Sequence, residues 1–424
     1  MRNSLSSTES SACKSNSNRR LRRLKTRRIP EGHTSSRKQN SGWLPLKNQP
    51  RGGSNRQRNM SSVCSSSKKD SNRLMLASVV KYAYPNAKTR AMKGLLLSED
   101  QFRSLLNTDT FDEVLHVLQT TQYAKALAEL PGGDPSTLEF TQILYNSLFR
   151  DYEKIIRSVD RKIRDFFILL YQKYELINLK TILRAIVSGI GPDQTSLLLL
   201  PTDRYTLFSK KALLDLYTVP DVITHLQGTF FHYPLNRALR RFEEEQEFFP
   251  LEMALDLHYY HTLWDTMEKL PDADRKILRH ILGMSTDILN VSWIIRFKEE
   301  FRFSPEEILN YTILHGEVFK FRERKALSEV QDTAEIIAYL KKTPYGTAFS
   351  EDVPLNTVHI ALSRYMIEQV RKYFSGNPFH IGVLLGYLWL KEFEISDILT
   401  IAEAKKYGFS LEQSRHYVIH VNSA

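Results

Sequence analysis

The sequence contains a short pattern that occurs three times along the chain. It reads YELINLKTILRA at residues 174–185, and degenerate copies read DILNVSWIIRFK and EISDILTIAEAK. The aligned acids of the three copies lie 112 and 107 residues apart. Repetition at this step predicts three units of domain size, and it constrains the fold before any other motif is considered. An acid and, three residues later, an amide or a second acid occur in every copy: Glu175 and Asn178, Asp287 and Asn290, Glu394 and Asp397.

A second pattern recurs in step with the first. Glu113, Asp221 and Glu335 are each followed by a leucine after five residues, a threonine after eight and an aromatic residue after ten. Because several positions recur at the same spacing in all three copies, chance does not explain the repetition. The followers are Leu118, Leu226 and Leu340, then Thr121, Thr229 and Thr343, and finally Tyr123, Phe231 and Tyr345.

The hydrophobic spacing from Met75 onward is helical. FTQILYNSLFRDYEKIIRSV, for example, places its apolar residues three and four positions apart, and no segment alternates as a strand does. A capping box is predicted at Ser98, a helix with proline at its first position is predicted after Ser304, and Gly189 to Pro192 predicts a helix end. The chain is therefore predicted to be all-α, with short helices followed by a longer pair in each unit. The expected units are 76–198, 199–314 and 315–424, which could stack as an open array or close into a ring.

Residues 1–75 differ from the rest of the chain. The first 74 residues hold 18 basic and 3 acidic side chains, whereas the formal net charge of the whole chain is +11. The remainder is therefore net acidic, by 4 charges. A Ser- and Arg-rich stretch with few periodic apolar residues cannot offset its conformational entropy by burial, so we expect a disordered basic tail.

The tail has several possible roles on sequence grounds. Its arginine runs suit binding to nucleic acid or an anionic membrane, and its composition also suits an organellar targeting peptide. A third possibility is that the true start is Met60 or Met75 rather than Met1.

Few classes of chemistry are compatible with the folded part. Cys13 and Cys64 both lie in the tail, so a disulfide, a thiol nucleophile and a cysteine zinc site are excluded from it. The apolar run 381–390 is too short to span a bilayer, so no transmembrane segment is expected. Phosphate-binding loops, dinucleotide fingerprints and hydrolase motifs are missing, and we expect no cofactor. His258 and His261 lie one helical turn apart, but surface or core histidines are favoured over a metal site.

The repeated acid and amide positions have two interpretations. Three symmetric polar groups could line a central opening, or they could be packing elements that hydrogen-bond to neighbouring helix ends. Because a single active site does not need three degenerate copies, the structural role is favoured. The recurring leucine and aromatic positions are assigned to the core.

Both ends of the folded part resemble one known family. Residues 79–106, VVKYAYPNAKTRAMKGLLLSEDQFRSLL, resemble the N-terminal motif of the C subunit of archaeal and bacterial A/V-type rotary ATPases, whose eukaryotic counterpart is the V-ATPase d subunit. The C-terminal stretch 377–408 is similar to the ending of the same family, and the tail has no counterpart in it. The matching positions are Tyr82 to Tyr84, Asn86 to Arg90, Leu95 to Ser98, and Tyr387, Lys391, Glu392, Glu394 and Ile401.

The resemblance implies a function as well as a fold. It implies a pseudo-threefold helical funnel that binds no nucleotide and acts as a rotor part. Such a protein would sit peripherally at the cytoplasmic face of the membrane, on the proteolipid ring, and receive the end of the central shaft. Through these partners it would couple the catalytic head to proton or sodium movement. The alternatives are an unrelated helical-repeat scaffold for protein interactions and a nucleic-acid-binding protein that uses the basic tail.

Overall fold

The computed structural model describes residues 60–130, 135–349 and 353–420. Every regular element within these ranges is a helix, so the predicted all-α class is confirmed. Residues 64–424 form one compact unit, to which the description below refers. Residues 1–59 of the expected tail lie outside the described part. Residues 60–75 belong to the first described helix, α2 (Met60–Lys93).

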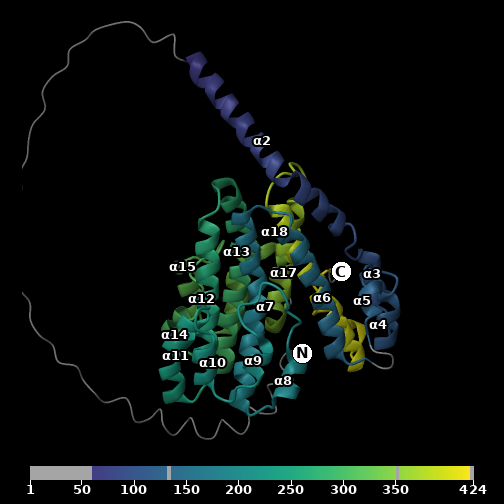
Figure 1. The fold of residues 1–424 in the computed structure, drawn as a ribbon, viewed down its shortest axis with the longest axis vertical. Helices are drawn as coiled ribbons and strands as arrows, with labels where there is room; N and C mark the ends of the chain where they lie inside the picture. Colours follow the sequence, from purple (N-terminus) through teal and green to yellow (C-terminus); the bar gives the residue numbers. More distant parts are fainter. Residues whose placement is uncertain (1–59, 131–134, 350–352, 421–424) are drawn as a thin grey trace, which may run out of the picture. The chain divides into compact units, whose positions relative to one another are not determined.

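Six long helices form the body of this unit (Figure 1). They are α6 (Thr137–Ile156), α7 (Arg161–Ser188), α12 (Phe249–Glu268), α13 (Asp272–Arg296), α17 (Val358–Lys372) and α18 (Gly382–Lys406). Consecutive pairs are antiparallel hairpins, joined by short turns at residues 157–160, 269–271 and 373–381.

Shorter helices precede, connect and follow these pairs. The first group is α3 (Glu99–Leu106), α4 (Phe111–Leu118) and α5 (Ala124–Leu127). The second is α8 (Pro192–Leu198), α9 (Lys210–Leu214), α10 (Val219–His225) and α11 (His232–Glu245). The third is the π-helix η3 (Phe297–Phe301), α14 (Pro305–Asn310), α15 (Phe321–Glu329), α16 (Thr333–Lys341), and the 3₁₀ helices η4 (Pro344–Ala348) and η5 (Leu355–Thr357). The last is α19 (Leu411–Arg415).

The helix boundaries follow local sequence signals. Ser98 and Ser304 each accept a hydrogen bond from the backbone N–H of the third residue in the helix that follows, and the side chain of that residue accepts from the serine N–H. The capping box predicted at Ser98 and the proline predicted at the first position of α14 are both confirmed. Helix α7 ends at Ser188, and Gly189 adopts a left-handed conformation with φ 71°. A glycine at this position avoids the strain that a side chain would add.

The six long helices contact one another in a closed succession. Besides the contact within each hairpin, α7 packs on α12, α13 packs on α17, and α18 packs on α6. The last of these contacts joins the final long helix to the first. The helices of this unit therefore close on themselves instead of ending in two free faces.

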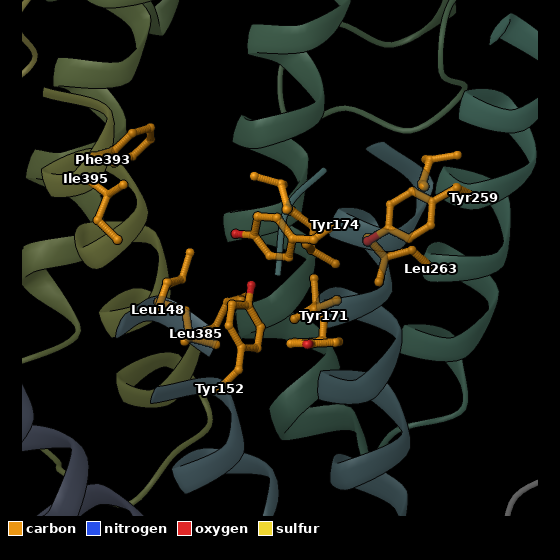
Figure 2. Packing of buried hydrophobic residues seen from close by; sticks show 14 of the residues in the cluster. Leu148, Tyr152, Tyr171, Tyr174, Tyr259, Leu263, Leu385, Phe393 and Ile395 are labelled. Carbon is orange, nitrogen blue, oxygen red and sulfur yellow. The ribbon is translucent and has the colours of Figure 1, made fainter. Parts of the chain in front are cut away.

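Tyrosines fill much of the interior between the long helices. Figure 2 shows Tyr152, Tyr171, Tyr174 and Tyr259 packed among Leu148, Leu263 and Leu385. The rings of Tyr152 and Tyr174 lie 5.9 Å apart in an edge-to-face arrangement, which is favourable for aromatic pairs. Side chains from α6, α7, α12, α13 and α18 leave a cavity of about 20 Å³ here, which is room for about one water molecule.

Within the described residues, none of the helices combines the length and the apolar character that crossing a membrane requires.

Candidate functional site

The six repeated polar positions all lie inside the protein. They come from α7, α13 and α18, and each of the six side chains is at most 1% exposed. Buried polar groups are costly unless they are hydrogen-bonded, so their partners define their role. We call each acid together with its amide or second acid a polar clamp. The clamps are Glu175 with Asn178, Asp287 with Asn290, and Glu394 with Asp397.

The second member of each clamp holds the backbone of a segment 22 or 23 residues further along the chain. The two asparagines both accept from a backbone N–H and donate to the carbonyl of the same residue, whereas Asp397 accepts from two successive N–H groups. The partners are Leu200 for Asn178 (2.7 and 2.9 Å), Ile313 for Asn290 (2.8 and 3.0 Å), and Ile419 and His420 for Asp397 (both 2.8 Å).

The first members of the clamps differ in how many donors they meet. Glu175 accepts from the Leu207 N–H at 3.0 Å. Asp287 accepts from the N–H groups of Val318 and Phe319 and from the Tyr345 hydroxyl at 2.7 Å. Glu394 accepts from the Leu97 N–H, the Gln122 amide, the Tyr123 hydroxyl and the Lys391 ammonium.

The third clamp is completed by the beginning of the folded chain. Leu97 and Tyr123 are separated from Glu394 by 297 and 271 positions, respectively. In the other two clamps, by contrast, every bonded partner follows the clamp along the chain. The segments that directly precede α3 and α5 thus supply to α18 the contacts that following segments supply to α7 and α13.

The second repeated pattern also makes equivalent contacts. The hydroxyls of Thr121, Thr229 and Thr343 donate to the carbonyls of Leu118, Leu226 and Leu340 at 2.6, 2.8 and 2.7 Å. These leucines are fully buried, as the assignment to the core predicts. The repeat boundaries and a threefold axis stay predictions, and so does a purely structural role for the six clamp positions.

The three acids have different electrostatic surroundings. Burial raises the pKa of Glu175 to about 7, opposed by the Leu207 N–H and by Lys210. Burial also raises the pKa of Asp287 to about 6, opposed first by the Tyr345 hydroxyl. In the second repeated pattern, Tyr123 and Tyr345 align with Phe231, whose ring has no hydroxyl.

The threefold repeat does not include Lys391 or Tyr387, although both are among the positions that resemble the family at the C-terminus. Lys391 is fully buried, its ammonium donates to the Tyr123 hydroxyl at 2.6 Å, and burial lowers its pKa. Nearby, the Tyr387 hydroxyl donates to Asp151 at 2.5 Å. The other two copies of the repeat have no lysine at the position equivalent to Lys391. Its part in the third clamp is therefore seen only from its hydrogen bond to the distant Tyr123.

The two histidines considered for a metal each have other neighbours. The His258 ring lies against Phe230 and Tyr233, and His261 lies 3.4 Å from Asp265 on the helix surface. Asp256 points instead to Lys180, at 2.8 Å. Within the part of the chain that the structure describes, no group of three metal-binding side chains is found.

Comparison with known families decides what kind of protein carries these clamps. A family model described as ATP synthase (C/AC39) subunit matches residues 85–417, most of the chain and all six clamp positions. The chain belongs to the ATP synthase (C/AC39) subunit family. It is thus a subunit of a rotary ATP synthase, as the resemblance at both ends of the folded part implied.

Several curated proteins of archaea are similar to this ATP synthase (C/AC39) subunit over most of their length. The A-type ATP synthase C subunit of Methanothermobacter thermautotrophicus is 29% identical over 334 residues, covering 77% of this chain and 84% of the relative. The protein of the same name from Pyrococcus horikoshii is 26% identical over 76% of this chain and 86% of its own. That from Archaeoglobus fulgidus is 27% identical over 80% and 96%.

Proposed function

We propose that this ATP synthase (C/AC39) subunit is a non-catalytic rotor coupler in the central stalk of a proton- or sodium-translocating ATPase. In this role it joins the central shaft to the membrane proteolipid ring. The observation that carries the proposal, beside the family, is the closed succession of long helices together with the bond between Tyr123 and Glu394. A part that transmits torque must resist twisting, and closure removes the free ends at which an open array would flex.

The clamps add to this stiffness. Each one fixes a connecting segment to a long helix through buried hydrogen bonds, which are strong in a low-dielectric interior. Three such joints, one on each hairpin, would distribute a load over all six helices. Units of 76–198, 199–314 and 315–424 arranged as a pseudo-threefold funnel remain part of the proposal.

The diameter of an α-helix limits where a shaft could bind to this protein. An α-helix with its side chains is about 10–12 Å in diameter, whereas the space between the long helices is a cavity of about 20 Å³. A shaft therefore binds at one end of the long helices and not between their middles. The other end would then be free for the proteolipid ring, and in this proposal the protein lies peripherally at the cytoplasmic face of the membrane.

Affinity purification tests the proposal. The full chain from Met1 is the bait, because α2 begins at Met60 and a start at Met75 would cut this helix. Tagged protein is recovered from gently solubilised membranes, and untagged cells serve as the control. Mass spectrometry should detect the shaft subunits, the proteolipid and, through the shaft, the catalytic head. Recovery of a folded protein without these partners would refute the rotor role and favour a scaffold.

A further inference from the structure

Helix α2 presents an uncovered apolar stripe. Leu76, Val80 and Tyr84 are spaced by four residues and are 65%, 78% and 66% exposed. Ala83, Ala87 and Ala91 are exposed on the same side, so the stripe extends over four turns of the helix. Single exposed apolar residues are common, but a continuous row on one face indicates an interaction surface.

The opposite face of α2 is bound to all three hairpins. Lys81 lies 3.6 Å from Asp160 in the turn between α6 and α7, and 2.8 Å from Asp274 at the start of α13. The Asn86 amide donates to the carbonyls of Pro378 and His380 in the turn between α17 and α18. A force applied to α2 therefore reaches each of the three hairpins directly.

Basic side chains lie on or beside the turns that α2 contacts. Arg161, Lys162, Lys276 and Arg371 are exposed on or beside these turns and make no ion pair within the described residues. The acids Asp160 and Asp274 are already paired with Lys81. A partner that carries acidic side chains beside an apolar ridge would complement this surface.

We propose that the α2 stripe binds a partner α-helix that belongs to the central shaft. This partner helix has an apolar ridge and acidic edges. This assignment rests on the proposed rotor function and specifies which surface receives the shaft. Small side chains at Ala83, Ala87 and Ala91 let a second helix approach closely, as in helix pairs packed through small residues. Alanines contribute little to insertion into lipid, so the composition of the stripe favours a helix over a membrane surface.

Site-specific photo-crosslinking tests the assignment in the intact complex. A photoreactive benzoylphenylalanine replaces Tyr84 in the full chain, and the control carries the same probe at Tyr217, which is 78% exposed. Both baits are purified from irradiated membranes and their adducts are identified by mass spectrometry. We expect the probe at position 84, but not at 217, to attach to a shaft subunit.

A second measurement uses substitutions on the exposed stripe. Val80→Glu with Tyr84→Glu places like charge opposite the acidic edges, and Tyr217→Glu is the matched control. We expect at least about a tenfold lower recovery of the shaft, a free-energy change of about 1.4 kcal/mol, with unchanged recovery of the proteolipid. Circular dichroism reports whether each variant is folded.

The outcomes separate this proposal from the function on which it rests. An adduct to the proteolipid or to lipid, or no adduct in a complex that does contain the shaft, overturns the α2 assignment and leaves the rotor function standing. Unchanged recovery of the shaft with the double variant also overturns it, as does loss of the proteolipid, alone or together with the shaft. If the unsubstituted chain recovers no ATPase subunit, the rotor function fails and this assignment fails with it.

Discussion

The Tyr123 hydroxyl donates a 2.7 Å hydrogen bond to Glu394, and these two residues are 271 positions apart in the chain. Tyr123 directly precedes α5, near the start of the folded part, and Glu394 lies in the middle of α18. The bond therefore joins the beginning of the succession of helices to its end. Both residues are buried, so the joint is shielded from water.

Replacing Tyr123 by phenylalanine should weaken this joint. Glu394 would lose one donor, and the Lys391 ammonium would lose the hydroxyl that lies 2.6 Å away. A hydrogen bond to a charged group contributes about 1.5–3 kcal/mol, so Tyr123→Phe should lower the free energy of unfolding by about that amount. Urea denaturation followed by circular dichroism measures the change.

The control for this substitution is Tyr407→Phe, because Tyr407 is 71% exposed. Its effect should stay within about 0.5 kcal/mol, as for most surface substitutions. Equal stabilities of the two variants would show that the Tyr123 bond does not hold the two ends together.

The first clamp should make stability depend on pH. Burial raises the pKa of Glu175 from 4.5 to about 7. The folded state therefore binds the proton more tightly than the unfolded state, and the free energy of unfolding should fall as pH rises from 4.5 to 7. The charged groups in this region are Lys210, which lies near Glu175, and the exposed Asp203, which lies near Lys210. Glu175→Gln removes this titration, so the wild type should lose about 3 kcal/mol relative to the variant across this range.

Urea denaturation at several pH values checks this expectation. The informative quantity is the difference between wild type and Glu175→Gln, since Asp287, whose pKa burial raises to about 6, titrates in both proteins. A difference that stays constant between pH 4.5 and 7 would contradict the assigned titration.

Phe231→Tyr should give the first clamp the hydroxyl that the other two possess. Tyr123 and Tyr345 donate to their acids at 2.7 Å, and Phe231 occupies the same position in the repeat. A donated hydrogen bond favours the ionised carboxylate, so the pKa of Glu175 should fall and the loss of stability should move to lower pH. Combining Phe231→Tyr with Glu175→Gln should abolish this shift, and a shift that persists would assign it to another group.

The sequence predicted the helical class, the capping box at Ser98 and the recurrence of the polar positions, because these depend on local spacing and on repetition. It did not predict which backbone groups the clamps hold. Asn178 and Leu200 are 22 residues apart and meet only because the intervening chain turns back along α7. The joint between Tyr123 and Glu394 depends on closure of the whole unit, and periodicity alone left open whether the units form a ring or an array.

The sequence also did not predict that the backbone at Gly316 passes close to the Asp287 carboxylate. A Cβ atom on Gly316 would lie 2.0 Å from an oxygen of Asp287 and 2.9 Å from the Phe319 carbonyl. Gly316→Ala should therefore displace the Asp287 carboxylate from Val318, Phe319 and Tyr345. Loss of several buried hydrogen bonds predicts a fall of roughly 2–4 kcal/mol in the free energy of unfolding.

Gly191→Ala is the matched control for this last substitution, because a Cβ atom at Gly191 would meet nothing within 4 Å. Its cost should stay within about 1 kcal/mol, the usual range for a changed helix N-cap. Hydrogen exchange localises the effect: in Gly316→Ala, the amides of Val318 and Phe319 should lose protection, whereas that of Leu207 in the first clamp should keep it. Equal loss at Leu207 would mean that the clamps open together, and the second clamp would then not be an independent joint.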